Sequence, residues 1–172
     1  APDATFTASH TSDYDPIAHI NDGIISFDTS PKNGWVNWKY PPIPEVTTLD
    51  MTLDTPTTLD SITFYFREDG GIYIPKDTLI QYWDAETQAW VDVTNQSQRD
   101  GFVSGEAQTV TFDPVVTTQL RAQFTRGEQD TSGGKKDCMV LTEVEVYANV
   151  PDSGSDVAKL ASLSVGGEAL ED

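Results

Sequence analysis

Residues 48–66 read TLDMTLDTPTTLDSITFYF, and this stretch decides the fold class. Polar and apolar residues alternate over Thr48–Asp54 and again over Ser61–Phe66, with a threonine- and proline-rich segment between the two runs. A two-residue period places one face of an extended strand against a core and the other face in water. The stretch therefore predicts two antiparallel strands joined by a turn at residues 55–58.

The same two-residue period recurs along most of the chain, whereas helical periodicity is nearly absent. Short strands separated by turns, without strand–helix–strand alternation, are typical of antiparallel sandwiches and barrels. We therefore predict an all-β protein, an antiparallel β-sandwich. The other expected strands are 5–9, 78–83, 90–93, 108–112, 119–124 and 140–147.

The charge balance argues against two classes of partner. Among 172 residues there are 28 acidic and 10 basic side chains, which gives a formal net charge of -18. Nucleic acids and anionic membranes both attract basic proteins, so neither is an expected partner. No apolar segment approaches the roughly 20 residues that span a bilayer. The acidity is expected to keep the protein soluble and monomeric, with cation binding as the alternative.

Motifs for catalysis are scarce. The single cysteine, Cys138, cannot form an intrachain disulfide, and a catalytic thiol needs an adjacent base, usually a histidine. Asp28, Glu68 and Asp69 could share a cleft, but a glycosidase needs two carboxylates at a set separation across the bound sugar. No such pairing, Walker loop or zinc spacing is recognisable. The chain is therefore not expected to be an enzyme.

Short motifs follow one another in a characteristic order. An Asp-Gly pair closes residues 18–23, two tryptophans follow within 33–38, an arginine lies in 65–71, and a glutamate lies in the last strand pattern, 141–147. This order resembles the discoidin, or coagulation factor C-type, domains, and within that group the family 32 carbohydrate-binding modules of bacterial glycoside hydrolases. The resemblance covers roughly residues 1–149 and implies a jelly-roll sandwich of the galactose-binding-like type.

The resemblance also implies a structural calcium site. In the family, an Asp-Gly turn and a glutamate of the last strand help to hold the ion, and these positions are Asp22 and Glu143 here. Asn33 stands where the family usually has a threonine, two residues before a tryptophan. Oxygen ligands of this kind suit a hard cation. The alternative is that Asp22 only caps a turn, with Gly23 at positive φ, and that Glu143 is an ordinary strand residue.

A sugar-binding site in the loops is the third implication. Arg67 occupies the position of the family arginine that bonds sugar hydroxyls, and its guanidinium fork can bridge two vicinal oxygens. Asp69 would add polar contacts, Tyr73 and Trp38 would stack on sugar rings, and Asn37 would replace a family histidine. As a surface contact, Arg67 could be changed to alanine with little effect on melting temperature.

Departures from the family pattern leave the identity of the sugar open. The family asparagine after the arginine is missing, and the loop 126–137 contains no aromatic residue. The resemblance implies that Trp35, the first tryptophan after the Asp-Gly turn, lies in the core. Trp83 and Trp90 are expected in the core because they fall in strand patterns. Trp38 could be core or sugar platform.

The expected function is that of a non-catalytic carbohydrate-binding module in a larger secreted or cell-surface bacterial glycoside hydrolase. It would bind a terminal sugar, galactose-configured or other, or a short glycan. The module would span residues 1–149, followed by a linker at 150–157 and a truncated domain at 158–172, which resembles the first strand of an immunoglobulin-like module. Neighbouring domains of the parent chain would then be partners. A structural spacer or protein-contact (adhesion) domain without glycan binding is the alternative.

Overall fold

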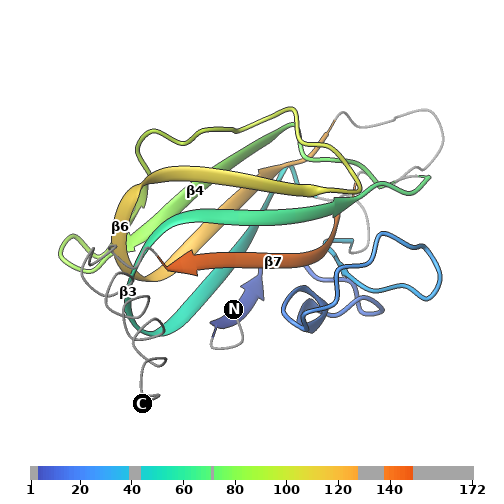
Figure 1. Cartoon of the computed structure of the whole chain (residues 1–172), viewed down its shortest axis with the longest axis horizontal. Coiled ribbons are helices and arrows are strands. Elements are labelled where there is room, and N and C mark those ends of the chain that lie inside the picture. Colours follow the sequence, from blue (N-terminus) through green and yellow to red (C-terminus); the bar gives the residue numbers. More distant parts are fainter. Residues whose placement is uncertain (1–3, 39–43, 71, 128–137, 149–172) are drawn as a thin grey trace, which may run out of the picture.

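The computed structural model describes residues 4–38, 44–70, 72–127 and 138–148, and it consists almost entirely of antiparallel strands (Figure 1). The elements are β1 (Ala4–Ala8), the 3-10 helix η1 (Ile17–Ile20), β2 (Trp35–Val36), β3 (Val46–Arg67), β4 (Asp77–Asp84), β5 (Ala89–Asp92), β6 (Ala107–Thr125) and β7 (Val140–Ala148). The predicted all-β, antiparallel fold class is confirmed. The expected linker and following domain lie outside the described residues.

Two long strands, β3 and β6, run through both layers of the sandwich (Figure 1). In one layer Val46–Thr52 pairs with Gln119–Thr125, and in the other Thr57–Tyr65 pairs with Ala107–Thr117. Strand β7 joins the second layer, while β1, β4 and β5 join the first. Because the hydrogen bonding is continuous, one path connects the strands in the order β2-β7-β3-β6-β4-β5, with β1 on β3.

The turn predicted at residues 55–58 is wrong, because the strand continues through this segment as a corner. The register with β6 shifts between Thr52 and Thr57, so the ladder is interrupted there. Pro56, which has no N–H to donate, lies within this interruption, where a proline costs no ladder hydrogen bond. The predicted strands at 108–112 and 119–124 are likewise two parts of the single strand β6.

The core between the layers is built from alternate residues of these strands. Phe64 packs against Phe66, Phe102 and Phe124, with ring centroids 5.7, 6.4 and 5.4 Å away. Trp35 is fully buried in the same cluster, which confirms its predicted place in the core. Within the described ranges, no helix is long and apolar enough to cross a membrane.

The prediction that Trp83 and Trp90 belong to the core is wrong. The two residues lie opposite each other on β4 and β5, and both are half-buried. Their neighbours Ile80 and Val93 point into the core, so the tryptophans stand on the outer face of the layer. Alternation shows which residues share a face, but it does not show which face meets the core.

Several connections between strands gather at one end of the sandwich, which we call the loop end, whereas the β4–β5 turn lies at the other end, beside the corner. Backbone hydrogen bonds join these segments across the fold: Tyr73 N–H donates to Cys138, Lys76 N–H to Thr125, and Arg126 N–H to Glu45. The segment that directly follows β2 joins them, because Asn37 N–H donates to the Met139 carbonyl at 3.4 Å. Residues far apart in sequence therefore meet here.

Replacing Phe64 with alanine should destabilise the fold by about 3–5 kcal/mol, because the substitution leaves a cavity among three packed rings. Urea denaturation followed by circular dichroism would measure the loss. Val116→Ala is the matched control, since Val116 is 66% exposed and its truncation should change stability by less than about 0.5 kcal/mol. Equal effects of the two substitutions would contradict this description of the core.

Candidate functional site

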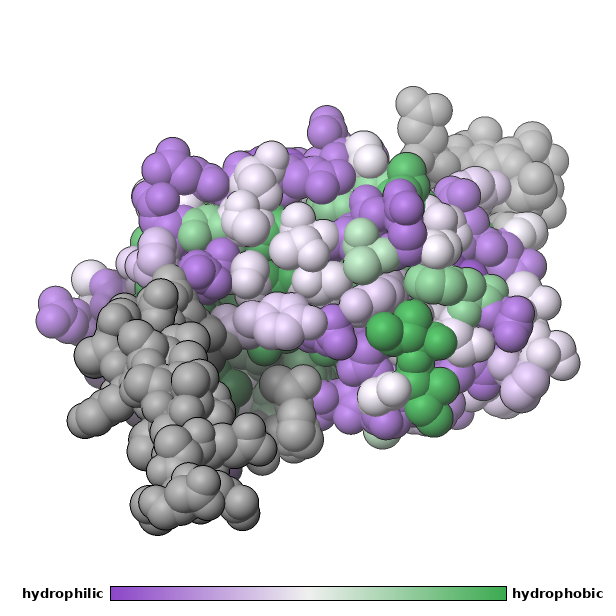
Figure 2. All heavy atoms as spheres, viewed as in Figure 1, coloured by the Kyte–Doolittle hydropathy of each residue, from purple (hydrophilic) through white to green (hydrophobic). Residues whose placement is uncertain are grey.

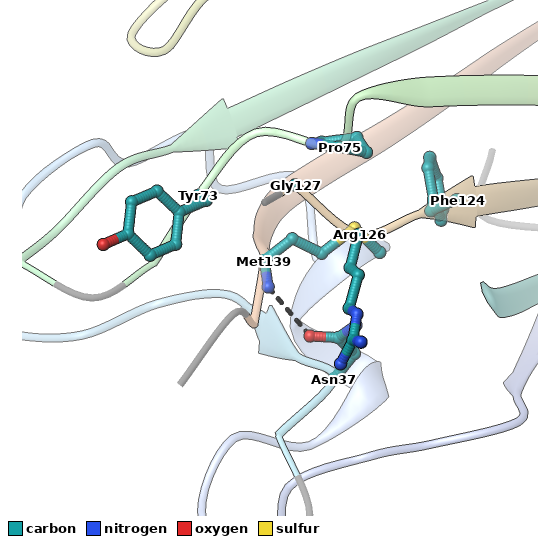
Figure 3. Close-up of a pocket in the computed structure, with 7 residues that line it drawn as sticks. All are labelled: Asn37, Tyr73, Pro75, Phe124, Arg126, Gly127 and Met139. Carbon is teal, nitrogen blue, oxygen red and sulfur yellow. Dashed lines mark hydrogen bonds between the residues drawn. The ribbon is translucent and has the colours of Figure 1, made fainter. Parts of the chain in front are cut away.

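A small pocket opens at the loop end (Figure 3). Its empty volume is about 210 Å³, including the part open to solvent. Its lining residues come from three connections and the end of β6: Asn37, Tyr73, Pro75, Phe124, Arg126, Gly127 and Met139.

Tyr73 lies at one edge of the pocket, and its ring points away from Asn37, Arg126 and Met139 (Figure 3). The chain reaches it through a tight return between Asp69 and Ile72, in which Ile72 N–H donates to the Asp69 carbonyl at 2.9 Å. Tyr73 N–H then donates to the Cys138 carbonyl at 2.8 Å, which fixes the backbone at this residue. The residue as a whole is half-buried. Its role as a platform for a sugar ring stays a prediction.

Asn37 lines the pocket, but its polar groups mostly form hydrogen bonds within the protein. Its Oδ1 accepts the N–H of Met139 at 2.8 Å, and its Nδ2 donates to Thr47 Oγ1 at 3.0 Å (Figure 3). The residue is only 3% exposed. It therefore ties the segments before β3 and β7 together and leaves little hydrogen-bonding capacity for a sugar.

Two further predicted sugar contacts, Trp38 and Asp69, lie outside this pocket. Trp38 is half-buried and packs against a small apolar cluster formed by Val36, Cys138 and Val140. The carbonyl of Asp69 closes the return before Tyr73, and its side chain is half-buried. Of the five predicted contacts, the structure thus brings only Asn37 and Tyr73 together.

Arg67, the remaining predicted contact, is buried with 3% of its surface exposed. Its Nη1 donates to the carbonyl oxygen of Asp28 at 2.6 Å and lies 3.5 Å from that of Asn33. Its Nε is buried and has no hydrogen-bond partner among the described residues. Both accepting carbonyls belong to the segment 21–34, so the guanidinium braces that segment against the sheet.

Arg126 and Met139 are pocket residues that the sequence reasoning missed. Arg126 directly follows β6, and Met139 directly precedes β7, so both stand at strand ends facing the loops. Position at the end of a strand pattern was the available signal for Arg126. Nothing in the sequence distinguishes Met139 from an ordinary core residue.

The three residues predicted to hold calcium do lie close together. Asn33 Nδ2 is 3.2 Å from Asp22 Oδ2, and Glu143 Oε2 accepts the N–H of Gly23 at 3.1 Å. Gly23 has φ +77°, which allows the turn that follows Asp22. The Ile24 carbonyl, 3.3 Å from the same Asn33 nitrogen, adds another oxygen. Among the described residues no three His, Cys, Asp or Glu side chains gather, so the carboxylates come as a pair.

Gly34 is the reason that this segment can approach the sheet so closely. Its φ is +143°, and an added Cβ would lie 2.9 Å from the Leu141 carbonyl oxygen and from Val140 Cγ1. A side chain at this position would push the segment away from β7, and with it Asn33 from the last strand. The short distance therefore requires glycine.

The Glu143 carboxyl is the electrostatically unusual group of this cluster. Burial raises its pKa above the usual value, the Gly23 N–H opposes that shift, and the nearby charge of Asp22 raises the pKa further. Among the described residues, no lysine or arginine forms an ion pair with it. A buried carboxylate beside a second carboxylate is an arrangement that a bound cation would stabilise.

The F5/8 type C domain family model matches residues 5–140 of the chain. No curated protein sequence matches this chain. Among solved structures, a chain of Streptococcus pneumoniae β-galactosidase BgaA is similar, with 22% identity, TM-score 0.70, and coverage of 83% of this chain and 90% of that chain.

Two Clostridium perfringens structures are also similar. One is the family 32 carbohydrate-binding module of NanJ in complex with galactose, at 18% identity and TM-score 0.63, covering 84% of this chain and 93% of that one. The other is CpGH89CBM32-5 with GalNAc-β-1,3-galactose, at 14% identity and TM-score 0.63, covering 85% and 96%. These likenesses support the jelly-roll sandwich topology of the fold.

Changing Arg67 to alanine should destabilise the protein by about 1–3 kcal/mol, because the substitution removes a buried guanidinium and its hydrogen bonds to the carbonyls of Asp28 and Asn33. This differs from the small effect expected of a surface contact. Chemical denaturation would measure it, with Lys76→Ala as the control at an exposed cation near the same end. Unchanged stability together with a loss of glycan affinity would instead identify Arg67 as a sugar contact.

Proposed function

The chain belongs to the F5/8 type C domain family, and on this basis we propose that it is a non-catalytic carbohydrate-binding module whose loop-end pocket holds a terminal sugar. One observation carries the proposal, namely the pocket that Tyr73, Asn37 and Arg126 line. A tyrosine ring can cover the apolar C–H face of a sugar. Guanidinium donors can bond hydroxyl groups around the sugar ring.

The charge of the chain favours a neutral ligand. The net charge of -18 repels polyanionic glycans at long range. Since two similar structures hold galactose or a galactose-containing disaccharide, galactose-configured terminal sugars are the first ligands to test. Arg67 and Asp69 would act on the sugar indirectly, through the loops that they shape.

The same proposal extends to the parent protein. Several similar structures come from bacterial carbohydrate-active enzymes, among them BgaA and a family 31 glycoside hydrolase of Clostridium perfringens. We infer that this module is part of a secreted or cell-surface bacterial glycoside hydrolase, with neighbouring domains as covalent partners. The module would keep the enzyme near its substrate without taking part in the chemistry.

We also propose that calcium braces the segment 21–34. The donor set fits, because Asp22 and Glu143 supply carboxylate oxygens and the Ile24 carbonyl lies beside them. Asn33 now directs its amide nitrogen toward Asp22, and rotating that amide by half a turn would present its oxygen instead. The ion would neutralise the carboxylate pair and position the loop, without contacting the sugar.

A structural spacer or protein-contact domain is the second candidate. One observation favours it: the polar groups of Arg67 and Asn37 bond within the protein, and Trp38 packs in an apolar cluster. If these residues serve only the fold, the loop end need not bind any ligand. A glycan array separates the two candidates, because a lack of binding to all neutral and charged glycans would support the spacer.

Tyr73→Ala should weaken binding of a sugar identified on the glycan array about tenfold or more, since the substitution removes the ring that would cover the sugar face. Isothermal titration calorimetry would give the two affinities. Tyr14→Ala is a matched control, because Tyr14 is 82% exposed and does not line the pocket. Equal losses in both variants would argue against the loop-end pocket as the binding site.

Calcium should raise the melting temperature of the wild type, because a ligand that binds only the folded state stabilises it, by about 2.7 kcal/mol at a hundred times its Kd. Glu143→Gln should abolish this rise, whereas Glu68→Gln, at an exposed carboxyl, should keep it. Differential scanning calorimetry with calcium or with chelator would test both. A calcium effect that survives in Glu143→Gln would place the ion elsewhere.

The pH dependence of Glu143→Gln follows from the raised pKa of Glu143. An ionised Glu143 opposes folding above its raised folded-state pKa, and this penalty disappears below the usual value of 4.5. With chelator present, Glu143→Gln should therefore melt higher than the wild type at neutral pH. The difference should vanish in melting curves recorded below that usual value.

A further inference from the structure

A second surface rich in polar and aromatic side chains lies on the outer face of the layer formed by β5, β4, β6, β3 and β1. The strand registers place Asp92, Gln81, Arg121, Asp50 and Thr7 directly across these five strands. Residues that lie opposite each other project to the same side of a sheet. The intervening residues are core side chains, so this row faces away from the core.

Trp83 and Trp90 continue this face two residues along β4 and β5, and Gln123 continues it along β6. We call the whole set the tryptophan face: Asp50, Gln81, Trp83, Trp90, Asp92, Arg121 and Gln123. The tryptophans are half-buried, and the side chains of Arg121 and Asp50 are 23% and 24% exposed. Rings and polar groups therefore both reach the surface.

Arg121 organises the middle of the tryptophan face. Its Nε and Nη2 donate to the two carboxylate oxygens of Asp50 at 2.6 and 2.7 Å. Its guanidinium carbon lies 4.1 Å from the centre of the Trp90 ring, which in turn packs edge-on against Trp83 with centroids 5.5 Å apart. A bidentate ion pair and a cation–π contact together fix the orientation of both side chains.

A chain of amide hydrogen bonds orders the neighbouring polar groups. Gln123 Nε2 donates to Gln81 Oε1 at 2.6 Å, and Gln81 Nε2 donates to Asp92 Oδ1 at 2.7 Å. Each amide still has capacity for further hydrogen bonds, as does Nη1 of Arg121. Donors and acceptors are thus held in place before any ligand arrives, which lowers the entropy cost of binding.

We propose that the tryptophan face is a second glycan-binding site, which takes a neutral oligosaccharide or polysaccharide chain lying across the strands. Planar amides, a guanidinium and carboxylates alternate as donors and acceptors for hydroxyl groups, and the tryptophan rings offer contact to C–H faces. The face extends across several strands, which are spaced about 4.8 Å apart, so it can contact consecutive sugars.

Charge and composition distinguish this ligand from other partners. Arg121 and Asp50 neutralise each other, Asp92 adds negative charge, and the chain as a whole carries -18, so an anionic chain is disfavoured. Of the exposed large apolar side chains among the described residues, only Val46, at the start of β3, lies on the same side of this layer. Apart from Val46 and the two tryptophans, the face is a row of amides, carboxylates and a guanidinium, groups that suit the hydroxyls of a glycan.

The tryptophan indole N–H signals in a two-dimensional NMR spectrum test the proposal directly. The chain has 4 tryptophans, and the fully buried Trp35 is an internal control. Cello-, xylo-, manno- and galacto-oligosaccharides would be titrated in turn, with oligogalacturonate as the anionic comparison. At least one neutral series should shift the Trp83 and Trp90 signals, leave Trp35 unchanged, and outcompete the anionic series. No shift of these two signals with any neutral series would overturn the proposal.

Two variants separate this site from the loop-end pocket. Gln81→Ala combined with Gln123→Ala removes hydrogen-bonding groups without touching the core, and it should weaken the titrated affinity about tenfold or more. Tyr73→Ala should leave unchanged the affinity that the shifts of the Trp83 and Trp90 signals report, whatever its effect on binding at the loop-end pocket. The opposite pattern, with binding lost in Tyr73→Ala and kept in the glutamine variant, would assign all binding to the loop end and refute a second site.

Discussion

The architecture depends on two strands that belong to both layers at once. Because β3 and β6 pair with each other before and after their corners, the two layers cannot shift independently. The ends of both strands that lie far from the corners bring connections together at the loop end. Alternate residues of the strands, such as Phe64 and Phe124, fill the space between the layers. The pocket, the carboxylate pair and the tryptophan face are all placed by this one pairing.

The loop end uses polar side chains to hold itself together. Arg67 fastens the segment 21–34 through backbone carbonyls, and Asn37 links the segments that precede β3 and β7. Side chains engaged in this way are poorly available to a ligand, so the sugar contacts that we propose fall to other lining residues of the pocket, Tyr73 and Arg126. The gain is a site whose walls are already ordered, which reduces the free energy lost when a ligand binds.

The alternation of apolar and polar residues predicted the fold class, since periodicity reports which residues share a face, whereas the burial of Trp35 was predicted from family resemblance. Alternation could not predict that residues 55–58 are a corner, because a register shift leaves no local pattern. It also misplaced Trp83 and Trp90, whose side of the layer follows from the register of β4 with β6 and of β5 with β4. The proximity of Asp22, Asn33 and Glu143 followed from family resemblance, whereas the burial of Arg67 depends on a long-range contact that no short motif encodes.

The placement of β1 and β7 has a mechanical consequence. Both strands pair with β3, and their outer ends, Ala4 and Ala148, lie opposite Leu53 and Leu59, beside the corner and away from the loop end. A force applied through these two ends would act across the hydrogen-bond ladders and open them one rung after another, instead of shearing all rungs together. The hydrogen bonds nearest the corner would thus break first, while those around a ligand at the loop end would carry no force at that stage.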